Sequence, residues 1–133
     1  MGEAGTQAAR DTQLFVTFSC AKRRLRALVD TGACRSILSG DCWDDIGKYQ
    51  CQEPRASQPL FSLTGAEIKS RGVVTVMMSG VPVDMYVVDN FHHDALLGVD
   101  ALRDLEAQVD VARGRVLLNR RHGPLAGRVR RAV

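Results

Sequence analysis

The sequence predicts an all-β, barrel-like domain with one short helix near its C-terminal end. Three observations support this fold class. About eight short apolar segments alternate with turn residues, one stretch has a helical apolar period, and 133 residues suffice for one core. We expect this domain to span residues 14–118, after a flexible leader at 1–13 and before a basic tail or linker at 119–133.

The first third of the chain predicts a hairpin followed by a short extended piece. Residues 14–18 are rich in β-branched and aromatic residues, which is typical of a strand. After a polar turn, Leu25, Ala27 and Val29 alternate with the side chains between them, as in a half-buried second strand. Residues 36–39 are then expected to be extended, and residues 40–47 to form one or two helical turns that end at a glycine.

The rest of the chain predicts further hairpins and the one substantial helix. Val99, Leu102 and Leu105 recur at a spacing of three with charged residues between them, which favours a short amphipathic helix. Thr64-Gly65 is typical of a hairpin tip. The expected strands are 61–63, 66–68, 73–78, 83–88, 95–98, 109–111 and 116–118, with an exposed connection at 48–59.

Composition excludes several classes of protein. Aromatic residues make up only 5% of the chain, which argues against base-stacking surfaces, and no apolar run approaches the roughly 18 residues of a membrane span. The leader has no apolar signal-peptide core. The four cysteines form no Cys-x-x-Cys pair and no zinc-like group with histidine. We therefore expect a soluble, cytoplasmic protein that spans no membrane.

The charge is unevenly distributed along the chain. Seven arginines and no acidic residue follow Asp110, so the net charge of +3 divides into +7 after that residue and −4 up to and including it. Such a tail can attract nucleic acid or anionic lipid electrostatically. A solvated linker or a polyprotein remnant is the interpretation that we favour.

The candidate chemistry lies in residues 27–33, Ala-Leu-Val-Asp-Thr-Gly-Ala. An apolar strand delivers Asp30 to a surface loop, where catalytic groups commonly lie. Gly32 permits a tight turn and leaves backbone N–H groups uncovered beside the carboxylate. Taken alone, the stretch is more typical of a plain strand-to-turn junction than of a catalytic loop, because Asp, Thr and Gly are ordinary turn residues.

Three separated features resemble one family. They are residues 27–33, the glycine-tipped hairpin at 63–66, and the segment Ala-Leu-Leu-Gly-Val-Asp-Ala-Leu at 95–102 before the predicted helix. In this order they resemble a retropepsin, the retrovirus-type aspartic protease, and in particular the proteases of Ty3/gypsy-like LTR retroelements. The resemblance implies a closed retropepsin barrel, a homodimer, and hydrolysis of peptide bonds in a polyprotein, with no cofactor and no metal.

The resemblance also assigns roles to individual residues. Asp30 matches the catalytic aspartate, and Thr31 matches the residue that braces the two active-site loops across the dimer axis. Gly32 and Ala33 complete that loop, with Gly32 offering backbone groups to the substrate main chain. The matching flap residues are Leu63, Thr64, Gly65 and Ala66, and the matching substrate-pocket residues, which are equally typical of a core, are Ile37 and Leu96.

One departure from the family pattern concerns charge beside the site. Family members often carry acidic residues just after the Gly-Ala and an arginine after the later glycine, and these groups form an ion pair. Here Cys34, Arg35 and Val99 occupy those positions, so that pair is absent. An Arg35 side chain that faces the cleft would favour an acidic or polar substrate residue.

Three functional hypotheses follow. The first is an active homodimeric protease, because the chain has a single Asp-Thr-Gly and a dimer supplies the second aspartate. The second is a domesticated retropepsin-like domain that serves as a dimerising or binding module. The third is a nucleic-acid-binding module built on the arginine-rich tail. Adjacent His92 and His93 lack a third metal ligand, and no histidine lies near Ser36 in sequence to activate it.

Overall fold

A computed structural model describes residues 13–50, 52–118 and 128–131. Residues 1–12 of the expected leader, Cys51, and residues 119–127 and 132–133 of the expected tail lie outside the described residues. The elements are β1 (Leu14–Cys20), β2 (Arg23–Val29), β3 (Ile37–Ser39), α2 (Gly40–Gly47), β4 (Leu60–Phe61), β5 (Glu67–Ile68), β6 (Val73–Met78), β7 (Val81–Val88), β8 (Ala95–Leu97), α3 (Val99–Asp104), β9 (Gln108–Asp110), β10 (Arg115–Leu117) and β11 (Arg128–Arg131).

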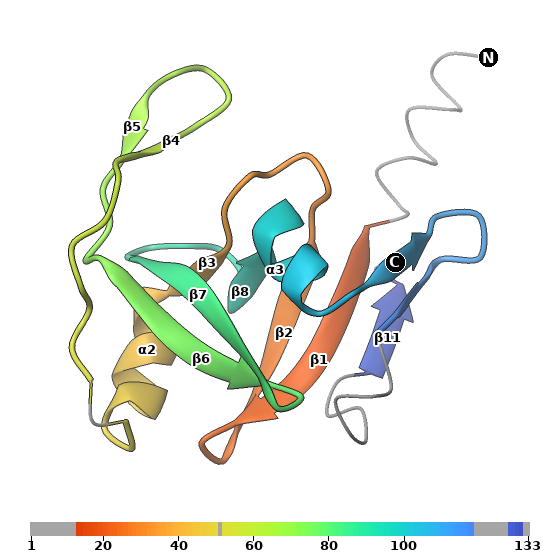
Figure 1. Cartoon of the computed structure of the whole chain (residues 1–133), viewed down its shortest axis with the longest axis horizontal. Coiled ribbons are helices and arrows are strands. Elements are labelled where there is room, and N and C mark those ends of the chain that lie inside the picture. Colours follow the sequence, from red (N-terminus) through yellow and green to blue (C-terminus); the bar gives the residue numbers. More distant parts are fainter. Residues whose placement is uncertain (1–12, 51, 119–127, 132–133) are drawn as a thin grey trace.

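Seven strands form one mixed sheet in the order β11-β1-β2-β8-β3-β7-β6. The hairpins β1–β2 and β6–β7 are antiparallel, whereas β2 pairs with β8 and β3 with β7 in parallel. The sheet curves into a half-barrel (Figure 1). The expected closed barrel is not confirmed, because within the described residues β6 and β11 remain the two separate edges of the sheet.

The helical turns expected at 40–47 form α2 and the helix expected from Val99 forms α3, so the described residues contain two short helices rather than one. The N-terminus of α2 is capped by Ser39, whose hydroxyl accepts a hydrogen bond from the Cys42 backbone N–H at 3.1 Å. The helix buries Trp43 and Ile46 in the main core. Eight residues are too few for a helix that is stable alone, so this tertiary burial is what stabilises α2.

Three apolar clusters hold the described residues together: two larger ones, and a small one that packs β1 against β10. The largest lies between the sheet and the two helices and includes Phe18, Leu25 and Leu97. The second, which packs Leu60 and Tyr86 with their neighbours, lies beneath the β4–β5 hairpin. It connects that hairpin to the end of the sheet where the loop after β2 emerges.

The β4–β5 hairpin stands away from the sheet, at the same end of the molecule as the loop after β2 (Figure 1). Its two arms meet at their base, where Arg55 and Val73 exchange backbone hydrogen bonds of 2.9 and 2.8 Å. Gly72 lies at this crossing with φ of +121°, and a Cβ there would come within 2.5 Å of the Arg55 carbonyl oxygen. Only glycine fits this close approach without displacement of the arms.

Part of the basic tail forms a strand. The backbone of β11 pairs with β1 in antiparallel register, with Arg131 opposite Leu14 and Arg128 opposite Thr17. The strand β11 thus extends the sheet by covering the edge of β1 that β2 leaves open. No helix among the described residues is both long and apolar enough to cross a membrane.

Candidate active site

Asp30 lies at the end of β2, in a loop whose geometry is set by hydrogen bonds. Its backbone N–H donates to the Leu97 carbonyl at 3.0 Å, which continues the parallel pairing of β2 with β8. The Gly32 N–H donates to Oδ1 of Asp30 at 2.9 Å, and the Ala33 N–H donates to its carbonyl at 3.2 Å. The loop therefore holds one half-buried carboxylate in a fixed orientation, beside an exposed Thr31.

A buried serine ties this loop to the start of α3. The Ser36 hydroxyl donates to Oδ1 of Asp100 at 2.6 Å and accepts from the Gly98 N–H at 2.9 Å. The Val99 N–H donates to the Ala33 carbonyl at 2.8 Å. Ser36 is fully buried, and because water does not reach its hydroxyl, the two hydrogen bonds to Asp100 and Gly98 are what satisfy that group.

The Ser36–Asp100 tie explains the Leu-Leu-Gly-x-Asp pattern physically. A Cβ on Gly98 would lie 2.6 Å from the Arg35 carbonyl oxygen and 2.8 Å from that of Ala33, so the two segments touch through backbone alone. Sequence reasoning missed the role of Ser36, because its partners lie 62 and 64 residues away. The available signal was the aspartate two residues after Gly98.

A cavity of about 530 Å³ brings most of the expected site residues together. Asp30, Gly32 and Ala33 line its floor, and the expected pocket residues Ile37 and Leu96 line it as well. Both of these apolar residues also pack in the cluster beneath the β4–β5 hairpin, so they contribute to core and cavity at once. The remaining lining residues are Cys34, Arg35, Pro59, Leu60, Phe61, Ser62, Leu63 and Ile68.

The tip of the β4–β5 hairpin closes one side of this cavity. The Gly65 N–H donates to the Ser62 carbonyl at 3.0 Å, and Gly65 has φ of +88°, which forms a tight turn. Leu63 lines the cavity, yet it is 99% exposed. The other expected flap residues, Thr64, Gly65 and Ala66, do not line it, and neither does Thr31.

An arginine anchors the base of the hairpin to the rest of the fold. Nη1 of Arg71 lies 2.6 Å from Oδ1 of Asp44 in α2, and Nη2 lies 2.5 Å from Oδ1 of Asp89 after β7. The hydrogen bond from Arg71 lowers the pKa of Asp44, and the two carboxylates raise the pKa of Arg71. Asp44, on the surface of α2, thus ties the base of the hairpin to this helix.

A second, polar cavity of about 400 Å³ adjoins the first, and Arg35 lines both. Arg55, Asp84, Asp100 and Asp104 are its other charged residues. His92 and His93 line neither cavity. The His93 ring packs against the ring of Phe15, with centroids 5.5 Å apart, and within the described residues no group of three potential ligands is placed to hold a metal.

Comparison with known proteins agrees with the fold. The family model described as Aspartyl protease matches residues 6–110. The retroviral protease-like domain of Ddi1 from Leishmania major has 20% sequence identity and a TM-score of 0.60, over 80% of this chain and 84% of that one. A retropepsin-like aspartic protease from Rickettsia conorii has 16% identity and a TM-score of 0.54, over 76% and 79% respectively. These similarities show a retropepsin-like fold.

Proposed function

This chain belongs to the aspartyl protease family, and from that premise we propose that it is a retropepsin-type endopeptidase that acts as a homodimer. One observation carries the proposal. A single Asp-Thr-Gly loop, fixed to β8 and α3, presents Asp30 at the floor of a largely apolar cavity beneath a hairpin. Such a cavity suits an extended peptide, and the chain supplies one carboxylate to it.

A second copy of the chain would complete the chemistry. Two aspartates at a two-fold axis are too close to ionise together, so they share a proton, as is established for aspartic proteases as a class. The ionised carboxylate takes a proton from water, whose oxygen attacks the scissile carbonyl carbon. The protonated carboxyl donates its proton to the carbonyl oxygen, and the amine leaves after it is protonated in turn. No covalent acyl-enzyme forms.

The other residues of the loop and hairpin then have defined tasks. Thr31, exposed in the single chain, would hydrogen-bond across the dimer axis and brace the two loops. Gly32 lets the substrate main chain approach the carboxylate, because a side chain there would contact Oδ1 of Asp30. Leu63 at the hairpin tip would lose its exposure when a peptide lies beneath it.

The substrate that we propose is a polyprotein of a retroelement, as the resemblance to Ty3/gypsy-type proteases implies. A second function, a domesticated dimerising or binding module, uses the same cavity without cleavage. It is favoured by the similarity to a protease-like domain that is named as part of Ddi1. Peptide binding by a wild-type dimer that cuts no peptide would select this second function.

A subunit-mixing experiment tests the proposal. Wild-type chain is titrated with Asp30→Asn chain, given time to exchange, and assayed on a peptide library. At equal amounts, random pairing leaves about a quarter of dimers wild type and half mixed. Mixed dimers hold one aspartate, so the rate should fall to about half of that expected from the wild-type protein alone.

Two further measurements complete this test. Rate per wild-type chain should rise with protein concentration below the dimer dissociation constant and level off above it. Asp30→Asn alone should lose cleavage by at least the roughly 10²–10⁴-fold that general acid–base catalysis contributes, with its circular dichroism unchanged. Activity that stays proportional to wild-type protein in the mixture would mean that one chain holds a complete site, and the dimer proposal would fail.

A further inference from the structure

Arg35 lies at the border between the two cavities and lines both of them. It follows Asp30 by five residues, lines the cavity above that aspartate, and also lines the adjoining polar cavity. Its backbone is held in place, because its carbonyl oxygen lies against Gly98, where a Cβ would come within 2.6 Å. Its side chain is exposed. The structure thus fixes the base of this side chain and leaves the guanidinium free to reach a ligand.

The charge of Arg35 is not balanced by an ion pair. Asp30 and Arg35 are the two charged residues among those lining the candidate active-site cavity. Across the parts of the chain that the structure describes, no carboxylate lies within ion-pair distance of the Arg35 guanidinium. An arginine that lines a concave site without such a partner retains its full capacity to bind an anion.

The carboxylates of the second cavity are mostly engaged elsewhere. Oδ1 of Asp84 lies 2.9 Å from Nη2 of Arg55, and Asp100 accepts the hydroxyl of Ser36 at 2.6 Å. Asp104, on α3, is the remaining carboxylate that faces this cavity. Among the carboxylates of this cavity only Asp84 is neutralised by an ion pair, so an acidic ligand group is expected to stay at Arg35 on the border and not to pass into the second cavity.

We propose that Arg35 selects substrates that carry an acidic side chain a short distance from the scissile bond. This inference rests on the proposed peptidase function and names its substrate class. The planar guanidinium can bind a carboxylate through two parallel hydrogen bonds, and enclosure by a cavity strengthens that contact over one in open water. The residues next to the scissile bond are expected to be apolar, because Ile37, Leu60 and Leu96 line the same cavity. In a homodimer each protomer contributes one Arg35, so the preference should occur on both sides of the bond.

The kinetic test uses ten-residue peptides with a central Leu-Leu pair, in which one other position at a time is Glu, Gln or Lys. For one substituted position on each side of the scissile bond, the kcat/KM of the wild type should be about tenfold higher with Glu than with Gln. Arg35→Gln should make the two equal, Arg35→Glu should favour Lys, and Arg35→Lys should keep a reduced preference for Glu. High salt should weaken the wild-type preference.

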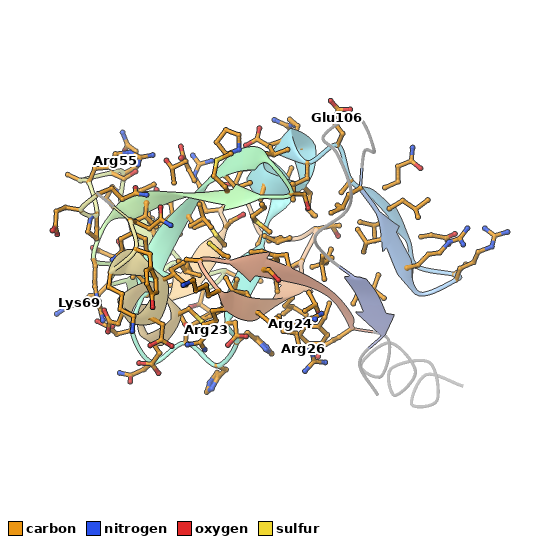
Figure 2. All side chains as sticks on the ribbon, turned by 90° about the horizontal axis from the view of Figure 1, so that it is seen from below. Arg23, Arg24, Arg26, Arg55, Lys69 and Glu106 are labelled. Carbon is orange, nitrogen blue, oxygen red and sulfur yellow. The ribbon has the colours of Figure 1, made fainter. Side chains whose placement is uncertain are left out.

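Arg24→Glu is the matched control for charge. Arg24 lies on β2 near the β1–β2 turn, at the opposite end of that strand from Asp30. Figure 2 shows it beside Arg26 and away from Arg55 of the second cavity. This variant should retain the wild-type ratio between Glu and Gln peptides. A wild-type ratio in Arg35→Gln, or a loss of selectivity as large in Arg24→Glu, would overturn the proposal.

A binding measurement separates this inference from the peptidase proposal. Asp30→Asn chain, with and without Arg35→Gln, is titrated with fluorescein-labelled Glu and Gln peptides and followed by anisotropy. The Glu peptide should bind about tenfold more tightly, and only when Arg35 is present. If wild type cuts no peptide but this difference in binding persists, the peptidase proposal fails and the role of Arg35 stands. Equal binding of the two peptides, or binding of neither, would refute the role of Arg35.

Discussion

Replacing Ser36 with alanine tests whether the tie between the Asp30 loop and α3 is energetically important. The change deletes the acceptor of the Gly98 N–H at 2.9 Å and the donor to Asp100 at 2.6 Å, in a position with 0% exposure. An orphaned buried donor costs about 1–3 kcal/mol, and a lost bond to a charged acceptor costs about 1.5–3 kcal/mol.

The two costs do not simply add. Asp100 keeps hydrogen bonds from the backbone N–H groups of Ser36 at 3.3 Å and Ala101 at 2.7 Å. The loss of its bond from the Ser36 hydroxyl should therefore cost about 1.5 kcal/mol or less. We therefore expect Ser36→Ala to lower the free energy of unfolding by about 2–4 kcal/mol in urea titrations. Because the same bonds position the Asp30 loop, kcat/KM should fall by about tenfold or more in fully folded protein.

Ser39→Ala provides the matched control. Ser39 is also buried, and its hydroxyl accepts one backbone N–H, that of Cys42, as the N-cap of α2. Loss of this cap should cost about 1 kcal/mol, with kcat/KM within about twofold of wild type. If Ser36→Ala destabilises no more than Ser39→Ala, or leaves kcat/KM unchanged, the tie does not position the active-site loop.

Three further predictions concern the dimer, the hairpin base and pH. Thr31→Ala should raise the dimer dissociation constant in ultracentrifugation, because unpaired buried partners cost about 1–3 kcal/mol, and an unchanged constant refutes the bracing role. Gly72→Ala should destabilise the fold in urea more than Gly65→Ala, since both have positive φ but a Cβ meets a carbonyl oxygen at 2.5 Å only at the former; equal losses would contradict the close approach. A hydrogen bond from the Thr75 hydroxyl is the main cause that lowers the pKa of Asp84, so this carboxylate stabilises the fold above its unfolded pKa, and the effect is lost as pH falls through the folded value. Asp84→Asn should therefore weaken the acid sensitivity of urea unfolding below about pH 4, whereas unchanged sensitivity would show that the interaction contributes nothing.

Local sequence patterns determined the strands and the location of the candidate loop. Alternating apolar residues in 23–29 correspond to β2, because a strand with one buried face has a period of two. The run 73–78 corresponds to β6, because β-branched side chains favour strands. The Asp-Thr-Gly stretch likewise identified Asp30 and Gly32, whose hydrogen bond spans only two residues. Such motifs can be recognised in a sequence because the hydrogen bonds that form them join residues only a few positions apart.

The tertiary structure decided the features that depend on distant partners. Stability of α2 depends on the burial of Trp43 and Ile46, and part of the basic tail became a strand because the edge of β1 was available to it. Arg71 joins α2 to the end of β7, across 27 and 18 residues of sequence. No periodicity in the sequence predicts these contacts, because they join segments that become neighbours only in the folded chain.

The same distinction applies to the candidate site. Sequence patterns alone indicated that one carboxylate follows an apolar strand, that a glycine-tipped hairpin comes next, and that a Gly-x-Asp segment precedes a helix. Only the tertiary structure brought Ser36 to Asp100 and placed Arg35 at the border of two cavities. The physical reason is that a buried hydrogen bond and a concave surface are made by segments far apart in the chain, and each exists only once the sheet has brought them together.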